Sequence, residues 1–201
     1  AYYYYSLYGF PKFSKRKIEI LYLHQNQLNV ISNPKVLKTL KEIQKLKKIK
    51  YIGVSIYNLK ELSFALKSKI IKVIQIPVNL ADSYLYSKIP TKCNKIFVAR
   101  SIYLQGALIN KLDKHPKKNN IKKYIKNIKD ICKKNNIKYF EAVTSYPFNL
   151  KKISYVIVSS VYKKNLKEIL SCIKFMNKEK MKALYHNSIK YKSWANPRNW
   201  K

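Results

Sequence analysis

Polar side chains stand at the ends of four successive β-branched runs in the sequence. His24 follows the first run, Ser55 ends the second, Gln75 lies in the third, and Arg100 with Ser101 closes the fourth. Their imidazole, hydroxyl, amide and guanidinium groups donate or accept hydrogen bonds, as a site for a polar ligand requires. Each of these residues alone is more often structural than functional. Their recurrence at four consecutive strand ends makes those ends the candidate site.

Short apolar runs alternate with longer segments of helical periodicity, and these elements would position the polar residues. Such alternation, with strands that are apolar throughout, favours a parallel sheet covered by helices. An open doubly wound sheet and a (β/α)8 barrel both satisfy the pattern, although the glycine-based phosphate loops of doubly wound folds are absent. In a barrel, the carboxyl ends of the strands converge on one site. Strands are predicted over residues 17–23, 51–55, 72–78, 95–100 and 153–159, and helices over 34–46, 58–67, 81–87, 121–132, 139–146 and 166–173.

Two of the predicted helices begin with capping residues. Asn33 precedes Pro34, which is the order expected of an N-cap followed by the first helical position. Asn58 precedes Glu61 by three residues, which resembles a capping box with Asn in place of Ser or Thr. Both patterns predict where a helix starts, independently of its apolar periodicity.

The net charge of +34 has two explanations. Clustered cationic residues displace counterions from phosphate, which would indicate a Lys-rich nucleic-acid-binding protein of the ribosomal type. Alternatively, Lys, Ile, Asn and Tyr all have AT-rich codons, and these four types make up half of the 201 residues. Only three of the 43 cationic residues are arginine, the residue that binds phosphate and guanine bidentately. The composition therefore favours an AT-rich genome, and we expect no specific nucleic-acid partner.

The remaining composition excludes several classes of protein. Hydrophobic residues make up 47% of the chain and aromatic residues 13%, which excludes a disordered basic tail. No apolar run approaches the ~18 residues that a membrane-spanning helix needs. Cys93, Cys132 and Cys172 are widely spaced, and the three histidines are scattered, so we predict neither a disulfide framework nor a metal site. A reducing, cytoplasmic location is the expectation.

Five segments of the sequence, in order, resemble the aldo-keto reductase family. Residues 18–24 (IEILYLH) are similar to the family's fourth strand, and residues 51–57 (YIGVSIY) are similar to its fifth. Residues 73–82 contain the QxPxNLxD form of the sixth strand. Residues 97–106 (FVARSIYLQG) resemble the seventh strand in the branch that reads ARSxxLQG, and residues 153–170 fit the eighth strand and helix. No single motif is decisive, but five in order make the resemblance strong.

The resemblance implies an α/β fold of the (β/α)8 TIM barrel type. The chain would carry only the C-terminal portion, about strands 4 to 8, because five strands are too few for a barrel that typically needs ~250 residues. We expect the partial barrel over residues 1–176 and a C-terminal tail over residues 177–201. The resemblance also implies an oxidoreductase that transfers hydride between NADP or NAD and a small carbonyl or sugar-like substrate.

The family's site residues carry over to this sequence one by one. His24 is implied as catalytic, because it would hydrogen-bond and polarise the substrate carbonyl. Ser55 and Gln75 would hold the nicotinamide carboxamide. Arg100 stands where many members stack an aromatic ring on the nicotinamide, and a guanidinium can also stack. The residues implied for the rest of the cofactor are Ser101 and Leu104 beside the pyrophosphate, and Ser160, Asn165 and Glu168 beside the adenosine.

The resemblance does not include the family's first three strands. With them are missing the catalytic Asp, the Tyr that serves as general acid, and the Lys that lowers the pKa of that Tyr. A phenol with a pKa near ~10 needs such a neighbour to act as an acid near pH 7. The chain starts with Ala1, and Tyr2–Tyr5 do not occupy the motif position. We therefore expect an incomplete sequence, inactive by itself; the alternative is a non-catalytic relative.

Overall fold

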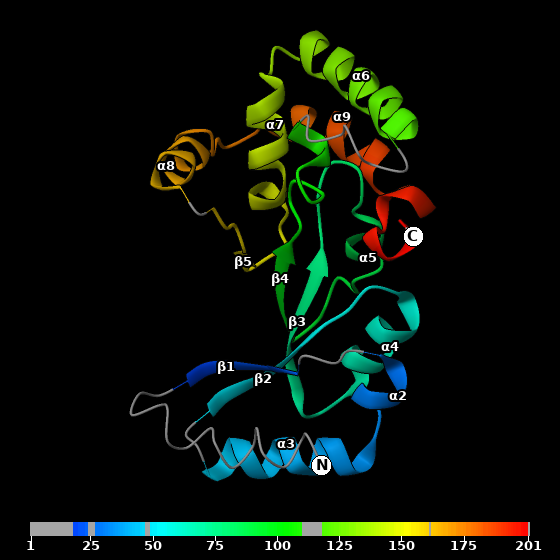
Figure 1. Cartoon of the computed structure of the whole chain (residues 1–201), viewed down its shortest axis with the longest axis vertical. Helices are drawn as coiled ribbons and strands as arrows, with labels where there is room; N and C mark the ends of the chain where they lie inside the picture. The colour runs from blue at the N-terminus through cyan, green and yellow to red at the C-terminus, as the bar shows by residue number, and fades with distance from the viewer. Residues whose placement is uncertain (1–17, 24–26, 47–48, 110–117, 161, 201) are drawn as a thin grey trace. The chain divides into compact units, whose positions relative to one another are not determined.

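The computed structural model describes residues 18–23, 27–46, 49–109, 118–160 and 162–200 (Figure 1). Within these ranges, strands alternate with helices, as predicted for an α/β fold. The five strands are hydrogen-bonded in their sequence order, and every described pairing is parallel. The strands are β1 Ile18–Leu23, β2 Ile49–Ser55, β3 Ile71–Pro77, β4 Ile96–Arg100 and β5 Tyr155–Val156.

Eight α-helices and four 3-10 helices lie within the described ranges. None of these helices combines the length and the apolar character that crossing a membrane requires. The α-helices are α2 Leu28–Ile31, α3 Pro34–Leu46, α4 Leu59–Lys67, α5 Tyr84–Ser87, α6 Lys118–Lys134, α7 Tyr139–Ser145, α8 Lys163–Ser171 and α9 Lys178–Ser188. The 3-10 helices are η1 Ala107–Ile109, η2 Tyr146–Asn149, η3 Ser193–Ala195 and η4 Pro197–Asn199.

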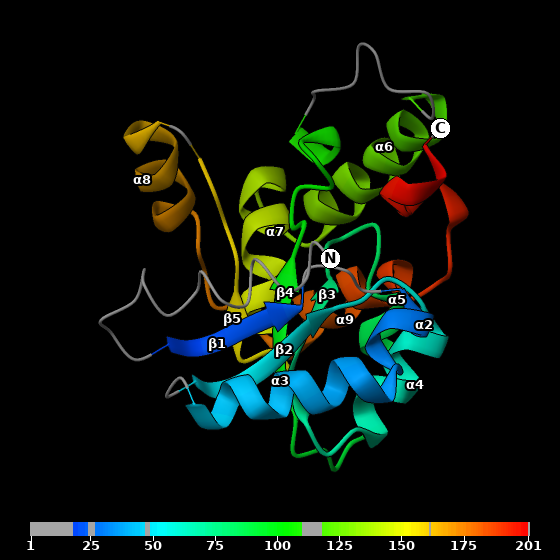
Figure 2. The same cartoon turned by 60° about the horizontal axis from the view of Figure 1, so that its bottom comes forward.

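The chain divides into two compact units. The first comprises residues 1–75 with 94–96, and the second comprises residues 76–93 with 97–201. In the first unit, α3 packs on β1 and β2 (Figure 2). The apolar side chains of this contact centre on Leu40, Ile49 and Ile52. Core burial of this kind accounts for the apolar strands that the sequence predicted.

Both predicted capping residues start helices in this unit. The Asn33 side-chain oxygen accepts a hydrogen bond from the Lys35 amide at 2.9 Å, and α3 begins at the next residue after Asn33. The Asn58 side chain accepts from the Glu61 amide at 2.9 Å. The Glu61 carboxylate accepts from the Tyr57 amide at 2.6 Å, one residue before the N-cap. The two helix starts are therefore confirmed. The second differs from a standard capping box because the Glu61 carboxylate accepts from the Tyr57 amide and not from the amide of the N-cap residue Asn58.

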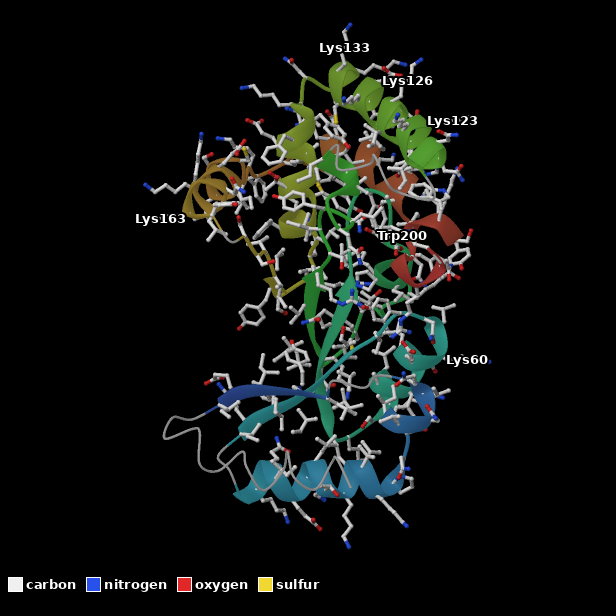
Figure 3. All side chains as sticks on the ribbon, in the orientation of Figure 1. Lys60, Lys123, Lys126, Lys133, Lys163 and Trp200 are labelled. Carbon is white, nitrogen blue, oxygen red and sulfur yellow. The ribbon has the colours of Figure 1, made fainter. Side chains whose placement is uncertain are left out.

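The lysines of α6 lie mainly on its solvent face. α6 buries Ile121, Ile125 and Ile128 against the second unit. Its exposed face carries most of its lysines, among them Lys123 and Lys126, whose side chains extend away from the ribbon in Figure 3. The apolar face of α6 is thus occupied by packing, and its charge is presented to solvent.

Several elements differ from the sequence-based expectation. The short helix α2 was not predicted. β5 has only two residues in place of the predicted seven, because Tyr155 and Ile157 are 60% and 45% exposed and the apolar run is not enclosed. α9 was not predicted at all. Its N-cap is Asn177, whose side chain accepts from the Lys180 amide at 3.0 Å, and only Leu184 and Ser188 are buried along its length. With so few apolar positions, the hydrophobic residues show little helical periodicity in the sequence. The Asn at the N-cap was the feature that could have predicted this helix.

Candidate active site

Two predicted site residues lie side by side in the first unit. Ser55 and Gln75 are register partners at the carboxyl ends of β2 and β3. The Gln75 carbonyl accepts a hydrogen bond from the Ile56 amide at 2.9 Å, which fixes the two strand ends together. Both side chains are partly buried. A hydroxyl and a carboxamide are therefore presented next to each other. His24, the predicted catalytic residue, lies outside the described residues.

Tyr22 joins this pair, and the sequence analysis did not identify it. Partial burial raises the pKa of the Tyr22 phenol above its usual value, and the nearby Gln75 side chain opposes this effect by a smaller amount. Tyr22 is the register partner of Gly53 on the neighbouring strand. A Cβ atom on Gly53 would lie 2.8 Å from two carbon atoms of the Tyr22 ring. A glycine inside a strand often marks such a close approach, so Gly53 was the signal that could have found Tyr22.

Replacing Gly53 by Ala is expected to lower the free energy of unfolding by about 1–3 kcal/mol, because the new methyl group overpacks the Tyr22 ring. The Tyr22 ring must then move away from Gly53. Denaturant unfolding of Gly53→Ala, Tyr22→Leu and the double variant measures this coupling. The cost of the Gly53 substitution should shrink when Tyr22 is already Leu. An equal cost in both backgrounds would show that Gly53 does not serve to accommodate the ring.

The second unit brings together the predicted residues at the end of β4. The Arg100 guanidinium donates to the Ser101 hydroxyl at 3.1 Å. The Leu104 amide donates to the Ser101 carbonyl at 2.9 Å, while the Leu104 side chain is buried. Ser101, Leu104 and Gln105 have φ angles of 56°, 48° and 54°, in the left-handed region that residues other than glycine seldom adopt. The loop after β4 therefore has a tightly specified backbone.

Two charged residues beside this loop were not assigned a role from the sequence. Burial raises the pKa of the Asp82 carboxyl to about 6, against the lowering effects of the Tyr84 amide and of the Lys192 and Arg100 charges. Burial lowers the pKa of Lys192 to about 8, against the attraction of Asp82. The Lys192 ammonium donates to the Ala81 carbonyl at 3.0 Å and to two further carbonyls near the end of α9. Only the QxPxNLxD pattern drew attention to Asp82, and it gave no function.

The predicted adenosine-side residues lie at and before α8. The Ser160 hydroxyl accepts from the Tyr162 amide at 3.1 Å, just before the helix begins. Asn165 and Glu168 are exposed and stand three residues apart on α8, so they share one face. Burial raises the pKa of Tyr103, with a smaller contribution from the Glu168 charge. Because Tyr103 belongs to the loop after β4, α8 and this loop lie near each other.

Each unit presents groups that fit one part of a nicotinamide dinucleotide. A carboxamide needs both a donor and an acceptor, and Gln75 with Ser55 offers both from partly buried positions. A pyrophosphate needs positive charge and polar hydrogens, which Arg100 and the Ser101 hydroxyl offer. Within the described ranges, no three His, Cys, Asp or Glu side chains are grouped as metal ligands would be.

Comparison with known families gives a match over most of the chain. The model of the aldo/keto reductase family matches residues 10–188. The chain belongs to the aldo/keto reductase family. Comparison with curated proteins finds no match. The family match covers all the described strands and ends at the last residue of α9.

Solved structures of aldo-keto reductases share the fold of this aldo/keto reductase chain. The apo form of AKR11C1 from Bacillus halodurans has a TM-score of 0.67 and 14% identity, with 86% of this chain and 62% of that chain covered. Glycerol dehydrogenase AKR11B4 from Gluconobacter oxydans has a TM-score of 0.61 and 14% identity, over 85% and 57% of the two chains. A mutant of Gox0644 in complex with NADPH has a TM-score of 0.62 and 18% identity, over 90% and 64%. The chain thus spans about 62% of the length of the Bacillus halodurans relative.

Proposed function

We propose that the protein is an NAD(P)H-dependent oxidoreductase acting on a small carbonyl or sugar-like substrate. The observation that carries this proposal is the register pair Ser55 and Gln75, a hydroxyl and a carboxamide at adjoining carboxyl ends of parallel strands in a chain of this family. Polar groups at these ends are where enzymes of barrel type carry their sites. NADPH is the cofactor chosen for testing because a structural neighbour, Gox0644, has been solved in complex with it.

In this proposal, β1 to β5 correspond to strands 4 to 8 of a (β/α)8 barrel, and residues 177–201 form the C-terminal tail. The order of the five family-like segments, the parallel pairings and the likeness to aldo-keto reductase folds support the assignment. The chain is shorter than these relatives, so the activity proposed is that of the whole protein.

The described residues would bind and orient the cofactor. Ser55 and Gln75 would hold the nicotinamide carboxamide, and the Tyr22 side chain lies close to Gln75. Arg100 would lie at the nicotinamide ring. The remaining contacts would come from Ser101 and Leu104 at the pyrophosphate and from Ser160, Asn165 and Glu168 at the adenosine. When bound, the nicotinamide supplies the hydride.

His24 would hydrogen-bond the substrate carbonyl, in keeping with the family resemblance. Proton transfer to that carbonyl needs a general acid, and the Asp, Tyr and Lys that provide it in the family have no counterpart in the matched segments. We therefore expect the 201-residue chain to bind NADPH without turning over a carbonyl substrate.

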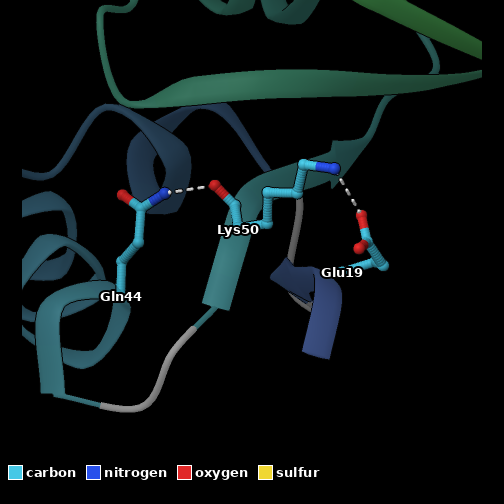
Figure 4. Close-up of polar contacts among 3 residues, drawn as sticks. All are labelled: Glu19, Gln44 and Lys50. Atoms are coloured by element: carbon cyan, nitrogen blue, oxygen red, sulfur yellow. Dashed lines mark hydrogen bonds and ion pairs between the residues drawn. The ribbon is translucent and has the colours of Figure 1, made fainter. Parts of the chain in front are cut away.

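Titration with NADPH at ~0.15 M salt is expected to quench the intrinsic fluorescence of the chain, which has 18 Tyr and two Trp. Gln75→Leu should weaken binding about 3- to 10-fold, the loss of one or two hydrogen bonds. Gln44→Leu is the matched control, because the Gln44 amide donates to the Lys50 carbonyl at 2.8 Å on the exposed side of α3 and β2 (Figure 4). It should leave the NADPH affinity unchanged.

The same titration separates this proposal from the nucleic-acid alternative. Non-specific binding of RNA to the lysine-bearing helix faces should fall steeply with salt. The absence of NADPH quenching, together with sequence-selective RNA binding that persists at ~0.2 M salt, would contradict the oxidoreductase proposal. Equal weakening of NADPH binding by Gln75→Leu and Gln44→Leu would contradict the role of the Ser55–Gln75 pair.

A further inference from the structure

Asn79 in the QxPxNLxD segment has no role in the function proposed above, yet it is completely buried directly after β3. Its side-chain oxygen accepts from the amides of Ala81 and Asp82, both at 2.9 Å. Its side-chain nitrogen donates to the Ser101 carbonyl at 3.0 Å. One carboxamide therefore closes the turn after β3 and also holds the backbone that follows β4.

The backbone held by Asn79 is unusual. Ser101, Leu104 and Gln105 all have left-handed φ angles, each of which costs roughly 1 kcal/mol for a residue with a Cβ atom. Such conformations persist only when surrounding contacts impose them. The Ser101 carbonyl accepts from both the Asn79 side chain and the Leu104 amide, so both of its lone pairs are used. The bond from Asn79 is thus the contact from outside the loop that orients the Ser101 peptide.

A second hydrogen bond between the same two segments lies next to the bond from Asn79 to Ser101. The Val78 amide donates to the Arg100 carbonyl at 3.1 Å, so the two residues that follow β3 are bonded to the last residue of β4 and to the residue after it. The Val78 bond joins backbone to backbone and would form with any residue at these positions. The bond from Asn79 depends on its side chain. That side chain must accept hydrogen bonds from the Ala81 and Asp82 amides and also donate one to the Ser101 carbonyl. Asn is a neutral side chain of this length with both capacities.

We propose that Asn79 is a positioning residue of the cofactor loop. Its side-chain bond to the Ser101 carbonyl sets the loop of residues 101–106, with its left-handed φ angles at Ser101, Leu104 and Gln105, and thereby orients the groups that meet the dinucleotide. This inference rests on the proposed function, since the loop matters to binding only if the chain binds a dinucleotide. Asn79 itself is completely buried and would not contact the cofactor.

Two substitutions separate this role from that of a simple turn residue. Asn79→Asp keeps the oxygen that accepts from Ala81 and Asp82 but loses the donor and sets a second oxygen against the Ser101 carbonyl. Asn79→Ser keeps a turn-forming acceptor and is too short to reach Ser101, so it serves if the Asp variant does not fold. Asn149→Asp is the matched control, because the Asn149 side chain makes the same kinds of bonds, two to carbonyls and one from the Met176 amide.

Amide hydrogen exchange without cofactor and NADPH affinity are measured on the full chain and on the three variants. The two Asn79 variants are expected to exchange the Leu104 and Gly106 amides about 10-fold faster and to bind NADPH about 10-fold more weakly, while Asn149→Asp changes neither. Protection of β2 and α6 should remain, which excludes general unfolding.

Unchanged exchange of the loop amides in both Asn79 variants would overturn the positioning role even if NADPH binds. Faster exchange with unchanged NADPH affinity would also overturn it, because the loop would then be held by Asn79 for no purpose in binding. Failure of the unsubstituted chain to bind NADPH would instead contradict the proposed function, and that result is read before any variant is compared.

Discussion

Replacing Tyr146 by Ala is expected to lower the free energy of unfolding of the second unit by about 3–5 kcal/mol, the usual cost of removing a large buried aromatic side chain. Tyr146 has no exposed surface and is among the largest fully buried side chains described. Its ring is surrounded by packed atoms that can relax only partly into the space left behind. The substitution therefore forfeits the transfer free energy of the ring and also leaves a cavity.

The hydroxyl of Tyr146 adds a smaller contribution. It donates to the Ser83 hydroxyl at 3.1 Å and lies 2.6 Å from the Ser188 hydroxyl. Both serines have further acceptors, since Ser83 donates to the Asn79 carbonyl and Ser188 to the Tyr185 carbonyl. Tyr146→Phe should thus cost only about 1 kcal/mol. The large difference between the Ala and Phe variants would assign most of the stability to packing of the ring.

Tryptophan fluorescence during urea unfolding measures these effects, because Trp194 and Trp200 both belong to the second unit. Tyr162→Ala is the control, since that side chain is 66% exposed and its removal should cost less than about 0.5 kcal/mol. A loss of no more than about 1 kcal/mol in Tyr146→Ala would show that the second unit is not organised around this residue.

The Tyr146 contacts show which features of the fold were accessible from the sequence. The strands up to β4, and the two helices that begin after Asn33 and Asn58, follow from local signals, namely β-branched runs and capping residues. The bond from Tyr146 to Ser83 joins residues 63 apart, and the bond from Lys192 to Ala81 joins residues 111 apart. Contacts at such separations leave no periodic trace in the chain. The weak apolar period of α9 has the same origin, because one of its two buried residues, Ser188, is polar and contacts Tyr146, so only the Asn177 cap signals this helix locally.

Some residues of the candidate site could likewise be predicted from the sequence, and others only from the structure. The polar strand ends Ser55 and Gln75 could be predicted, because parallel strands present their carboxyl ends together. Gly53 was the local signal for Tyr22, but the sequence does not show which side chain of the neighbouring strand lies over that glycine. Asn79 was visible as a motif residue, but only the distance to the Ser101 carbonyl gives it a physical purpose.

Replacing Asp82 by Asn is expected to raise the free energy of unfolding at pH 7 by up to about 3 kcal/mol, corresponding to a pKa shift of about two units. Burial raises the pKa of Asp82 from 3.8 to about 6, so the folded state binds this proton more tightly than the unfolded state does. The stability that this carboxyl contributes is therefore present at low pH and declines as the pH rises from about 4 to about 6. Asn resembles the neutral carboxyl and can still accept from the Tyr84 amide, which lies 3.2 Å from the Asp82 oxygen.

Urea unfolding of both proteins between pH 4 and pH 8, followed by tryptophan fluorescence, tests this expectation. The advantage of Asp82→Asn should be small at about pH 4, grow through about pH 5, and stay constant above about pH 6. Asp130→Asn is the control, because it removes one exposed carboxylate from α6 and so makes the same change in net charge. A variant that is less stable than the wild type at pH 7 would contradict the expectation. In that case, the attraction of Lys192 and Arg100 for the ionised carboxylate would outweigh the cost of burying it.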